Sequence, residues 1–340
     1  MANLEPIAES PRSIYEAIYA PVKAEIILAA VKIGLFSHLE EPISLAALVD
    51  KLGWEPRASE LLLSGLAACD LLLKQDGLFT NSPEASRFLV PGKPTYLGDH
   101  LLSTHRMVTG GLADLPERLL KGPAPQEQQA TQAHKIDWSA MAEGMANSAR
   151  AGRVQMVLPL IQGLPEFPAF RKMLDLGGGP GILCIAMVQA HPTMSGVVFD
   201  NPAMEDKARQ YIKEYGLTER IAFLGGDYMR DPIGSGYDLV WASSSLNYCG
   251  ERLDELTTKV YEALEPGGVF AVLQEGMANE GTKPPEMVLP MLAWRLNSDE
   301  GINFEQGQIA QAMLEAGFRS VRSRTVETLH GPMDLDVARK

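Results

Sequence analysis

The sequence has few cysteines, and their spacing excludes two kinds of site. Cys69, Cys184 and Cys249 are the three cysteines of the 340-residue chain; their number is odd and no C-x-x-C motif is present. A disulfide framework needs pairs of cysteines, and a thiolate metal site needs closely spaced ligands. His100 and His105 are five residues apart, not the four that place two ligands on one helix face. We therefore expect free thiols in a reducing, cytoplasmic compartment and no metal site.

Positive charge and long hydrophobic runs are also scarce. The 30 Lys and Arg are outnumbered by 43 Asp and Glu, which gives a net charge of −13. Because phosphate contacts dominate nucleic-acid affinity, this charge argues against a nucleic-acid partner. The most apolar early stretch, residues 26–36, is interrupted by Lys32 and is far shorter than the roughly 20 residues of a membrane span. Residues 1–5 lack the basic start of a secretory signal, so we expect neither membrane association nor secretion.

Enough apolar residues are present for two folded domains. The sequence is 46% hydrophobic and 21% charged, which is typical of a globular protein, and its length suits two domains of about 150 residues. The first hundred residues carry three short helical patterns followed by a hairpin pattern around Asp76-Gly77. These elements are expected at residues 24–33, 44–49, 57–72 and 73–80. Three helices followed by a hairpin predict a winged-helix domain.

A winged helix raises the alternative of a transcription regulator. Residues 1–100 contain eight Lys and Arg against thirteen Asp and Glu, and the third predicted helix has no basic cluster. Such a domain lacks the basic face that contacts DNA phosphates. We therefore do not expect this domain to bind DNA.

The spacing of apolar residues changes in the second half of the chain. A Pro- and Gln-rich stretch at residues 121–130 and a helical pattern at 138–160 separate it from the first half. Short apolar runs then alternate with helical stretches, which predicts a parallel sheet with helices on both faces. Strands are expected at 173–176, 196–200, 221–224, 237–242 and 269–274, helices at 182–190, 204–215 and 252–264, and two later strands at 320–326 and 333–338. The predicted domains are residues 1–105, a linker with helices at 106–165, and residues 166–340.

A glycine-rich turn follows the first of these strands. Residues 174–181 read Leu-Asp-Leu-Gly-Gly-Gly-Pro-Gly and open a helix, which is where sheets of this kind bind ligands. The dinucleotide fingerprint of nicotinamide enzymes needs a further glycine, but Ile182, Leu183 and Cys184 stand in the three possible places. A nicotinamide oxidoreductase is therefore disfavoured. The turn supplies four candidate cofactor residues: Asp175, Gly177, Gly179 and Gly181.

Two more acidic residues follow the next strands. Asp200 ends the second strand about 20 residues after the glycines, the usual distance for a carboxylate that binds ribose hydroxyls. Gly226, Asp227 and Tyr228 follow the third strand. Each signal is weak alone, but the series of strand ends predicts a nucleotide-like cofactor site.

The spacing G-x-G-x-G after Asp175 resembles motif I of the S-adenosylmethionine-dependent methyltransferases. Nearly the whole chain resembles the small-molecule O-methyltransferase family that includes plant phenolic, acetylserotonin, bacterial polyketide and bacteriochlorophyll-pathway enzymes. The resemblance implies a Rossmann-like class I methyltransferase sheet preceded by a mostly helical winged-helix domain, S-adenosylmethionine as cofactor, and a homodimer formed through the N-terminal domain. The segments that carry it, besides the glycine turn, are 33–36, 48–53, 77–79, 141–148, 265–270 and 314–318.

The resemblance also implies roles for individual side chains. In methyltransferases of this type the acid at Asp227 binds the adenine amino group, and the next side chains, here Tyr228, flank the ring. Ser243 or Ser244 occupies the place of a basic residue that touches the cofactor in the family. The acceptor pocket is implied at Met145, Met287, Met291, Trp294, Asn297 and Phe304.

One departure from the family pattern concerns the chemistry. Relatives that methylate hydroxyls usually carry a His general base after the fourth strand, and here Asn247 stands in its place. The Glu that steadies the His is retained as Glu275, and Tyr248 is the leading polar catalytic candidate, with an ordinary packing role as its alternative. Asn cannot take a proton at neutral pH.

Methyl transfer remains possible without that His. Orientation of the reactants can contribute roughly 7–11 kcal/mol, whereas a general base contributes about 10²–10⁴-fold. A base is dispensable when the acceptor is already anionic, is a thiolate, or is an electron-rich carbon. We therefore predict O-, C- or S-methylation of a small aromatic or conjugated acceptor without the usual His base. The alternative is a family member that binds S-adenosylmethionine for non-methylating chemistry.

Overall fold

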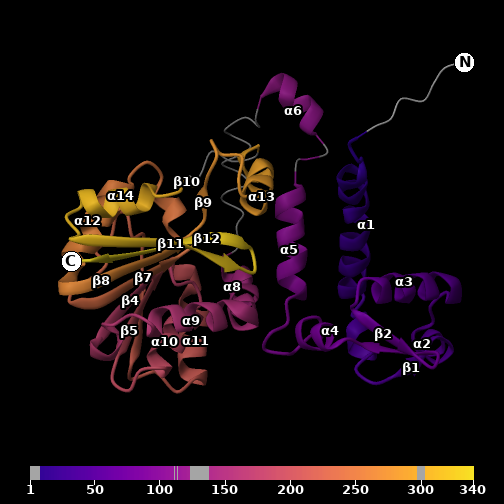
Figure 1. Ribbon diagram of the computed structural model, residues 1–340. Coiled ribbons are helices and arrows are strands. Elements are labelled where there is room, and N and C mark those ends of the chain that lie inside the picture. Colours follow the sequence, from indigo (N-terminus) through magenta and orange to yellow (C-terminus); the bar gives the residue numbers. More distant parts are fainter. Residues whose placement is uncertain (1–7, 111, 113, 123–137, 297–302) are drawn as a thin grey trace, which may run out of the picture. The chain divides into compact units, whose positions relative to one another are not determined.

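A computed structural model describes residues 8–110, 112, 114–122, 138–296 and 303–340, without the side chains of 138–140, 293 and 294 (Figure 1). The chain divides into two compact units, one ending at Leu102 and the other beginning at Ser103. Within the described ranges, no helix is both long enough and apolar enough to cross a bilayer.

The N-terminal unit is mostly helical and contains a small antiparallel sheet in the order β1-β3-β2. Its helices and strands are α1 (Arg12–Lys32), β1 (Ile43–Ser44), α2 (Leu45–Leu52), α3 (Pro56–Ala68), β2 (Leu72–Gln75), β3 (Leu78–Asn81), α4 (Pro83–Phe88) and the start of α5 (Gly98–Thr109). The first helix begins twelve residues earlier than the predicted start at 24. Pro21 is typical of a helix start in sequence, but the helix continues through it.

Local sequence signals account for the turns of this unit. The Ser44 hydroxyl accepts a 3.2 Å hydrogen bond from the Ala47 N–H and so caps α2, which ends at Gly53 in the left-handed conformation. Asp76 and Gly77 both have positive φ, as the two central residues of a type I′ hairpin turn require. The predicted hairpin is therefore present as β2 and β3.

The C-terminal unit contains a seven-stranded sheet in the order β11-β12-β8-β7-β4-β5-β6. Strands β4 to β8 are parallel to one another, whereas β12 is antiparallel to both β8 and β11. The strands are β4 (Lys172–Leu176), β5 (Ser195–Asp200), β6 (Ile221–Gly225), β7 (Tyr237–Ser243), β8 (Leu264–Gln274), β11 (Ser320–Thr328) and β12 (Gly331–Arg339). The predicted class I methyltransferase sheet, preceded by a helical domain, is confirmed.

Helices cover both faces of this sheet (Figure 1). Side chains from α9, α10 and α11 pack in one apolar core with one face, and those from α12 and α14 pack in a second core with the other. The described helices are α6 (Leu115–Lys121), α8 (Trp138–Ser148), α9 (Val154–Gln162), α10 (Ile182–Gln189), α11 (Glu205–Glu214), α12 (Leu253–Ala263), α13 (Pro285–Arg295) and α14 (Gln308–Glu315). The short strands β9 (Gly276–Met277) and β10 (Phe304–Glu305) form a separate parallel pair.

The segment before the sheet differs from the single helix predicted at 138–160. A π-helical turn, η2 (Ala149–Arg153), separates α8 from α9. Extra residues in such turns redirect side chains and are frequent at functional sites. Its last residue is Arg153.

Candidate functional site

Five strand ends place the predicted cofactor residues at one edge of the sheet. Strands β4 to β8 run parallel, so their carboxyl ends share that edge. The glycine turn follows β4, Asp200 ends β5, and residues 226–228 follow β6. Residues 243–248 follow or end β7, and Glu275 follows β8. Ligands of open α/β sheets bind at this edge.

The glycine turn has no room for side chains. Gly177 and Gly181 both have φ in the left-handed region, near 70° and 79°. A Cβ on Gly177 would lie 2.4 Å from Cβ of Ser245, and a Cβ on Gly181 would lie 3.0 Å from Cγ2 of Val198. Gly181 is also the residue before α10, so the turn brings unencumbered backbone to a helix N-terminus.

Asp200 is bound to the glycine turn. Its Oδ2 accepts a 2.6 Å hydrogen bond from the Gly179 N–H, and its Oδ1 accepts a 2.7 Å bond from the Asn201 N–H. Burial raises the pKa of Asp200, although both hydrogen bonds oppose the shift. The carboxylate therefore lies beside the turn.

Asp175 is buried beneath the turn, with 2% of its surface exposed. Its Oδ2 accepts a 3.2 Å hydrogen bond from the Cys184 N–H at the start of α10. Burial raises the pKa of Asp175 to about 7, and the negative charge of Asp200 adds to the shift. These contacts connect Asp175 to the backbone of α10.

The loop after β6 is linked to the loop after β7. The Tyr228 hydroxyl donates a 2.6 Å hydrogen bond to the Ser245 carbonyl, and burial raises the pKa of this phenol. Asp227 is exposed, and its Oδ1 accepts a 2.9 Å bond from the Met229 N–H. The Gly226 N–H donates to the Asp200 carbonyl at 3.0 Å. Gly226 therefore lies next to Asp200, and Tyr228 joins this loop to the one after β7.

Buried polar atoms are present at the end of β7. Ser243 Oγ and Asn247 Oδ1 are buried and lack a hydrogen-bond partner among the described residues. Unsatisfied buried polar atoms are rare unless a ligand, ion or water satisfies them. Tyr248, next to Asn247, is 50% exposed. This strand end therefore fits a polar ligand.

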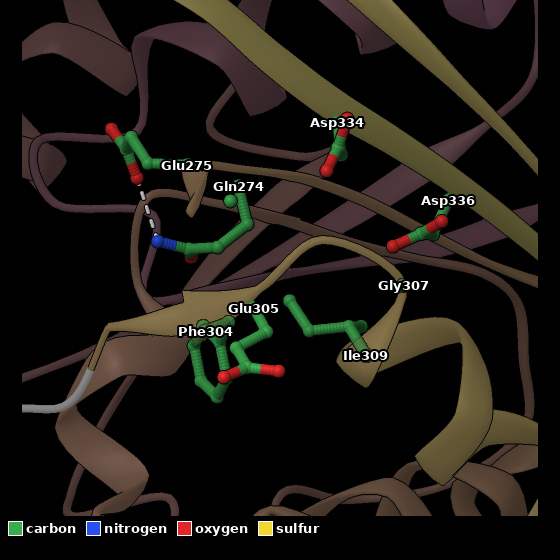
Figure 2. Close-up of a pocket in the computed structure, with 9 residues that line it drawn as sticks. Gln274, Glu275, Phe304, Glu305, Gly307, Ile309, Asp334 and Asp336 are labelled. Atoms are coloured by element: carbon green, nitrogen blue, oxygen red, sulfur yellow. Dashed lines mark hydrogen bonds between the residues drawn. The ribbon is translucent and has the colours of Figure 1, made fainter. Parts of the chain in front are cut away.

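Glu275 is held through both of its oxygens. The Ser244 hydroxyl donates a 2.8 Å hydrogen bond to Oε1, and the Gln274 side-chain amide donates a 2.6 Å bond to Oε2 (Figure 2). Gln274 in turn accepts a 3.2 Å bond from the Leu246 N–H. The carboxylate is thus fixed in orientation at the edge of the sheet.

Arg153 is a site residue that sequence reasoning missed. Its Nη2 lies 3.5 Å from the Ser244 hydroxyl. Burial lowers the pKa of Arg153, and the charge of Glu275 opposes that shift. The structure therefore places a guanidinium next to Ser244, where the sequence showed only serines in place of the family's basic residue. No sequence motif marks Arg153, because the π-helical turn determines its direction.

The predicted acceptor-pocket residues occupy three kinds of place. Met145 lies beside the glycine turn, because a Cβ on Gly179 would be 3.3 Å from its Cε. Met287 and Met291 are half-buried on α13. Phe304 is 1% exposed and belongs to an apolar core, where it lines a small pocket with Glu275 (Figure 2). Asn297 and the side chain of Trp294 lie outside the described residues.

Two family models match the chain. An O-methyltransferase domain matches residues 128–319, and an O-methyltransferase dimerisation domain matches residues 15–91. The tetracenomycin polyketide synthesis 8-O-methyl transferase of Streptomyces glaucescens is 28% identical over 97% of each chain. The N,N-dimethyltransferase OxyT of Streptomyces rimosus is 28% identical over 96% of each chain. Bovine acetylserotonin O-methyltransferase is 27% identical, over 93% of this chain and 94% of the relative.

Solved structures show the same fold. Human N-acetylserotonin methyltransferase in complex with SAM has a TM-score of 0.79 and 22% identity, over 99% of each chain. An O-methyltransferase family protein from Burkholderia thailandensis also has a TM-score of 0.79 and 22% identity, over 98% of this chain and 99% of the other. The likeness extends over both units of the chain.

Proposed function

Because the chain belongs to the O-methyltransferase family, we propose that it transfers a methyl group from S-adenosylmethionine to a hydroxyl of a small aromatic or conjugated acceptor. The reaction proceeds without a histidine at position 247, where Asn stands. One observation carries the proposal: the Asp200 carboxylate is hydrogen-bonded to Gly179 within the glycine turn. A half-buried carboxylate beside unencumbered backbone suits the ribose of a nucleoside cofactor.

The residues at the sheet edge fit S-adenosylmethionine. The glycine turn (Gly177, Gly179 and Gly181, over Asp175) leaves space for its amino-acid portion, and Asp200 would bind the ribose hydroxyls. Asp227 and the ring of Tyr228 would hold the adenine, with Gly226 between them and Asp200. Ser243 offers a buried hydroxyl, since that of Ser244 is bonded to Glu275. When bound, the cofactor supplies a methyl group activated by its positively charged sulfur.

Apolar side chains would orient the acceptor. Met145 lies next to the glycine turn, and Met287 and Met291 lie on α13. Met side chains adapt to flat, irregular ligands. Among the relatives, the tetracenomycin and acetylserotonin enzymes have aromatic compounds in their names. We therefore favour an aromatic or conjugated acceptor, aligned by the methionines.

The N-terminal unit would form a homodimer. Its match to a dimerisation domain coincides with an exposed apolar face on α1. Ile14, Ile18 and Val22 are four residues apart and 66%, 67% and 62% exposed. Residues at this spacing lie on one face of a helix. A second copy of the chain would bury that face.

A transfer assay tests the proposed function. The enzyme is incubated with methyl-labelled S-adenosylmethionine and, in turn, 2-naphthol, 7-hydroxycoumarin and 1,8-dihydroxyanthraquinone, and products are identified by mass spectrometry. The expected product carries one labelled methyl group on oxygen and appears together with S-adenosylhomocysteine. Tight cofactor binding by calorimetry without any methylated product would contradict this proposal and favour the alternative of non-methylating chemistry.

A further inference from the structure

The turn between β11 and β12 lies at the edge of the sheet where β8 ends (Figure 1). Strand β12 is antiparallel to β8, with Asp334 opposite Gln274, the last residue of β8. The residues that precede Asp334 therefore extend past the carboxyl end of β8. Leu329 and His330 form this turn between the two strands.

Hydrogen bonds fix the backbone of the turn. The Thr328 hydroxyl donates a 2.7 Å bond to the Gly331 carbonyl and accepts a 3.1 Å bond from the His330 N–H. His330 is thus held at a defined position, while its side chain is exposed. An exposed side chain on a fixed turn can meet a ligand without rearrangement.

Neighbouring elements enclose the turn on two sides. A Cβ on Gly152 of η2 would lie 2.3 Å from Cδ1 of Leu329, so the turn packs against the π-helical turn. A Cβ on Gly331 would lie 2.7 Å from Cβ of Glu286, so the turn also packs against α13. The turn that carries His330 is therefore between the element that carries Arg153 and the helix that carries Met287 and Met291.

The charges around His330 come from three elements. Arg153 of η2 and Glu275 after β8 are close enough to shift the titration of its imidazole. Partial desolvation of the ring by the surrounding elements is the largest effect and lowers the pKa of His330, Arg153 lowers it further, and Glu275 raises it. Glu286 is the acidic residue of α13 that adjoins the turn. The net effect keeps the imidazole neutral near pH 7, so that it can accept a proton.

We propose that His330 is the general base of this methyltransferase, supplied by the β11–β12 turn in place of the family histidine that Asn247 replaces. Glu275 would be its positioning residue, since its carboxylate is fixed by Ser244 and Gln274 and favours the protonated imidazole. The inference rests on the proposed function, because O-methylation of a hydroxyl releases one proton.

The proposed step moves one methyl group and one proton. A lone pair of the acceptor's hydroxyl oxygen forms the new O–CH₃ bond as the C–S bond breaks, and the electrons of the C–S bond remain on sulfur. The hydroxyl proton moves to an unprotonated imidazole nitrogen of His330. The imidazolium then gives this proton to water, which restores the neutral base.

Substitution of His330 tests the proposal. In His330→Gln we expect kcat/KM for 2-naphthol at pH 7.5 to fall about 100-fold, within the range of a lost general base. Cofactor affinity by calorimetry should stay within about twofold. The loss should be smaller with the more acidic 7-hydroxycoumarin, and imidazole added to His330→Ala should restore part of the rate. His38→Gln, in the N-terminal unit, is the matched control and should keep the wild-type rate.

Two results would overturn the assignment. One is a loss under threefold in His330→Gln; the other is a large loss in Tyr248→Phe combined with an unaffected His330→Gln, which would make Tyr248 the catalytic group. Both are measured against a wild-type enzyme that transfers methyl, so they are distinct from a failure of the proposed function. In that failure, the wild type would methylate none of the phenols.

A second measurement needs no acceptor. The imidazole of His330 is titrated by NMR in the complex with S-adenosylhomocysteine, using His330→Gln to assign its signal. We expect Glu275→Gln to lower the pKa of His330 and Arg153→Met to raise it. An unchanged titration in both variants would show that the three side chains do not form one cluster and would overturn the proposal.

Discussion

The Gly179 N–H donates a 2.6 Å hydrogen bond to Oδ2 of Asp200. The carboxylate assigned to the ribose therefore also holds the turn that would face the cofactor. Asp200→Ala should weaken S-adenosylmethionine binding at least tenfold, because a hydrogen bond to a charged group contributes about 1.5–3 kcal/mol. Calorimetry on both proteins measures this change. The exposed Asp206→Asn on α11 is the control, and equal affinities for wild type and Asp200→Ala would remove Asp200 from the site.

Asp175 should make stability depend on pH. Its pKa is about 7 when folded and near 3.8 when exposed, so the folded state holds a proton that the unfolded state lacks between these values. This stabilisation is fully present below about pH 4 and is lost as the pH rises through 7. Between pH 5 and pH 7.5 the free energy of unfolding of the wild type should fall by about 2–3 kcal/mol relative to that of Asp175→Asn. Urea unfolding at both pH values measures the difference. An equal change in the free energy of unfolding of the two proteins would refute the prediction.

The exposed face of α1 should hold two copies together. Ile18→Glu would place a charge in the middle of that face, where burial without a partner is costly. Sedimentation should give about twice 37.0 kDa for wild type and about 37.0 kDa for the variant. Leu314→Glu, on an exposed position of α14, is the control and should remain dimeric. A dimeric Ile18→Glu protein would argue against this interface.

The pH dependence of turnover should follow His330. Because burial and Arg153 lower the pKa of this imidazole below 6.5, kcat/KM should be level near pH 7.5 and fall as the pH drops through that lowered pKa. Arg153→Met should move the acidic limb to higher pH, and His330→Gln should lack the limb. If the acidic limb of the kcat/KM profile lay at the same pH in all three proteins, it would report the titration of another group.

Asn247→His should raise kcat/KM only in a protein that lacks the base His330. In the wild-type background we expect less than a threefold change with 2-naphthol, because His330 already accepts the proton. In the His330→Gln background the new imidazole should recover at least tenfold in kcat/KM, since a general base contributes about 10²–10⁴-fold. Steady-state rates of the two single variants and the double variant measure the effect. A large gain in the wild-type background would mean that the enzyme lacks a base.

Much of the fold could be predicted because its signals are local. Ser44 and Gly53 mark the ends of α2, and Asp76-Gly77 marks the hairpin, since each needs only its own neighbours to act. The parallel strands were visible as short apolar runs because they are buried. The first half of α1 was missed, since its apolar side chains remain exposed within its own unit and Pro21 resembles a helix start.

The cofactor side of the site was more predictable than the catalytic side. Glycines and acids after consecutive parallel strands must meet at one edge, so Gly179 and Asp200 could be paired from their order alone. Arg153 and His330 could not be found in this way. One is directed by a π-helical turn, and the other depends on the register of an antiparallel strand that is distant in sequence.

The hydrogen bond from Tyr228 to the Ser245 carbonyl joins two loops that would contact different ligands. The loop after β6 would surround the adenine, whereas the loop after β7 carries Asn247 and Tyr248 toward the acceptor. With this connection, displacement of one loop strains the other. The preference among acceptors would therefore be coupled to the position of the nucleoside, and we expect substitutions around the adenine to alter selectivity without contacting the acceptor.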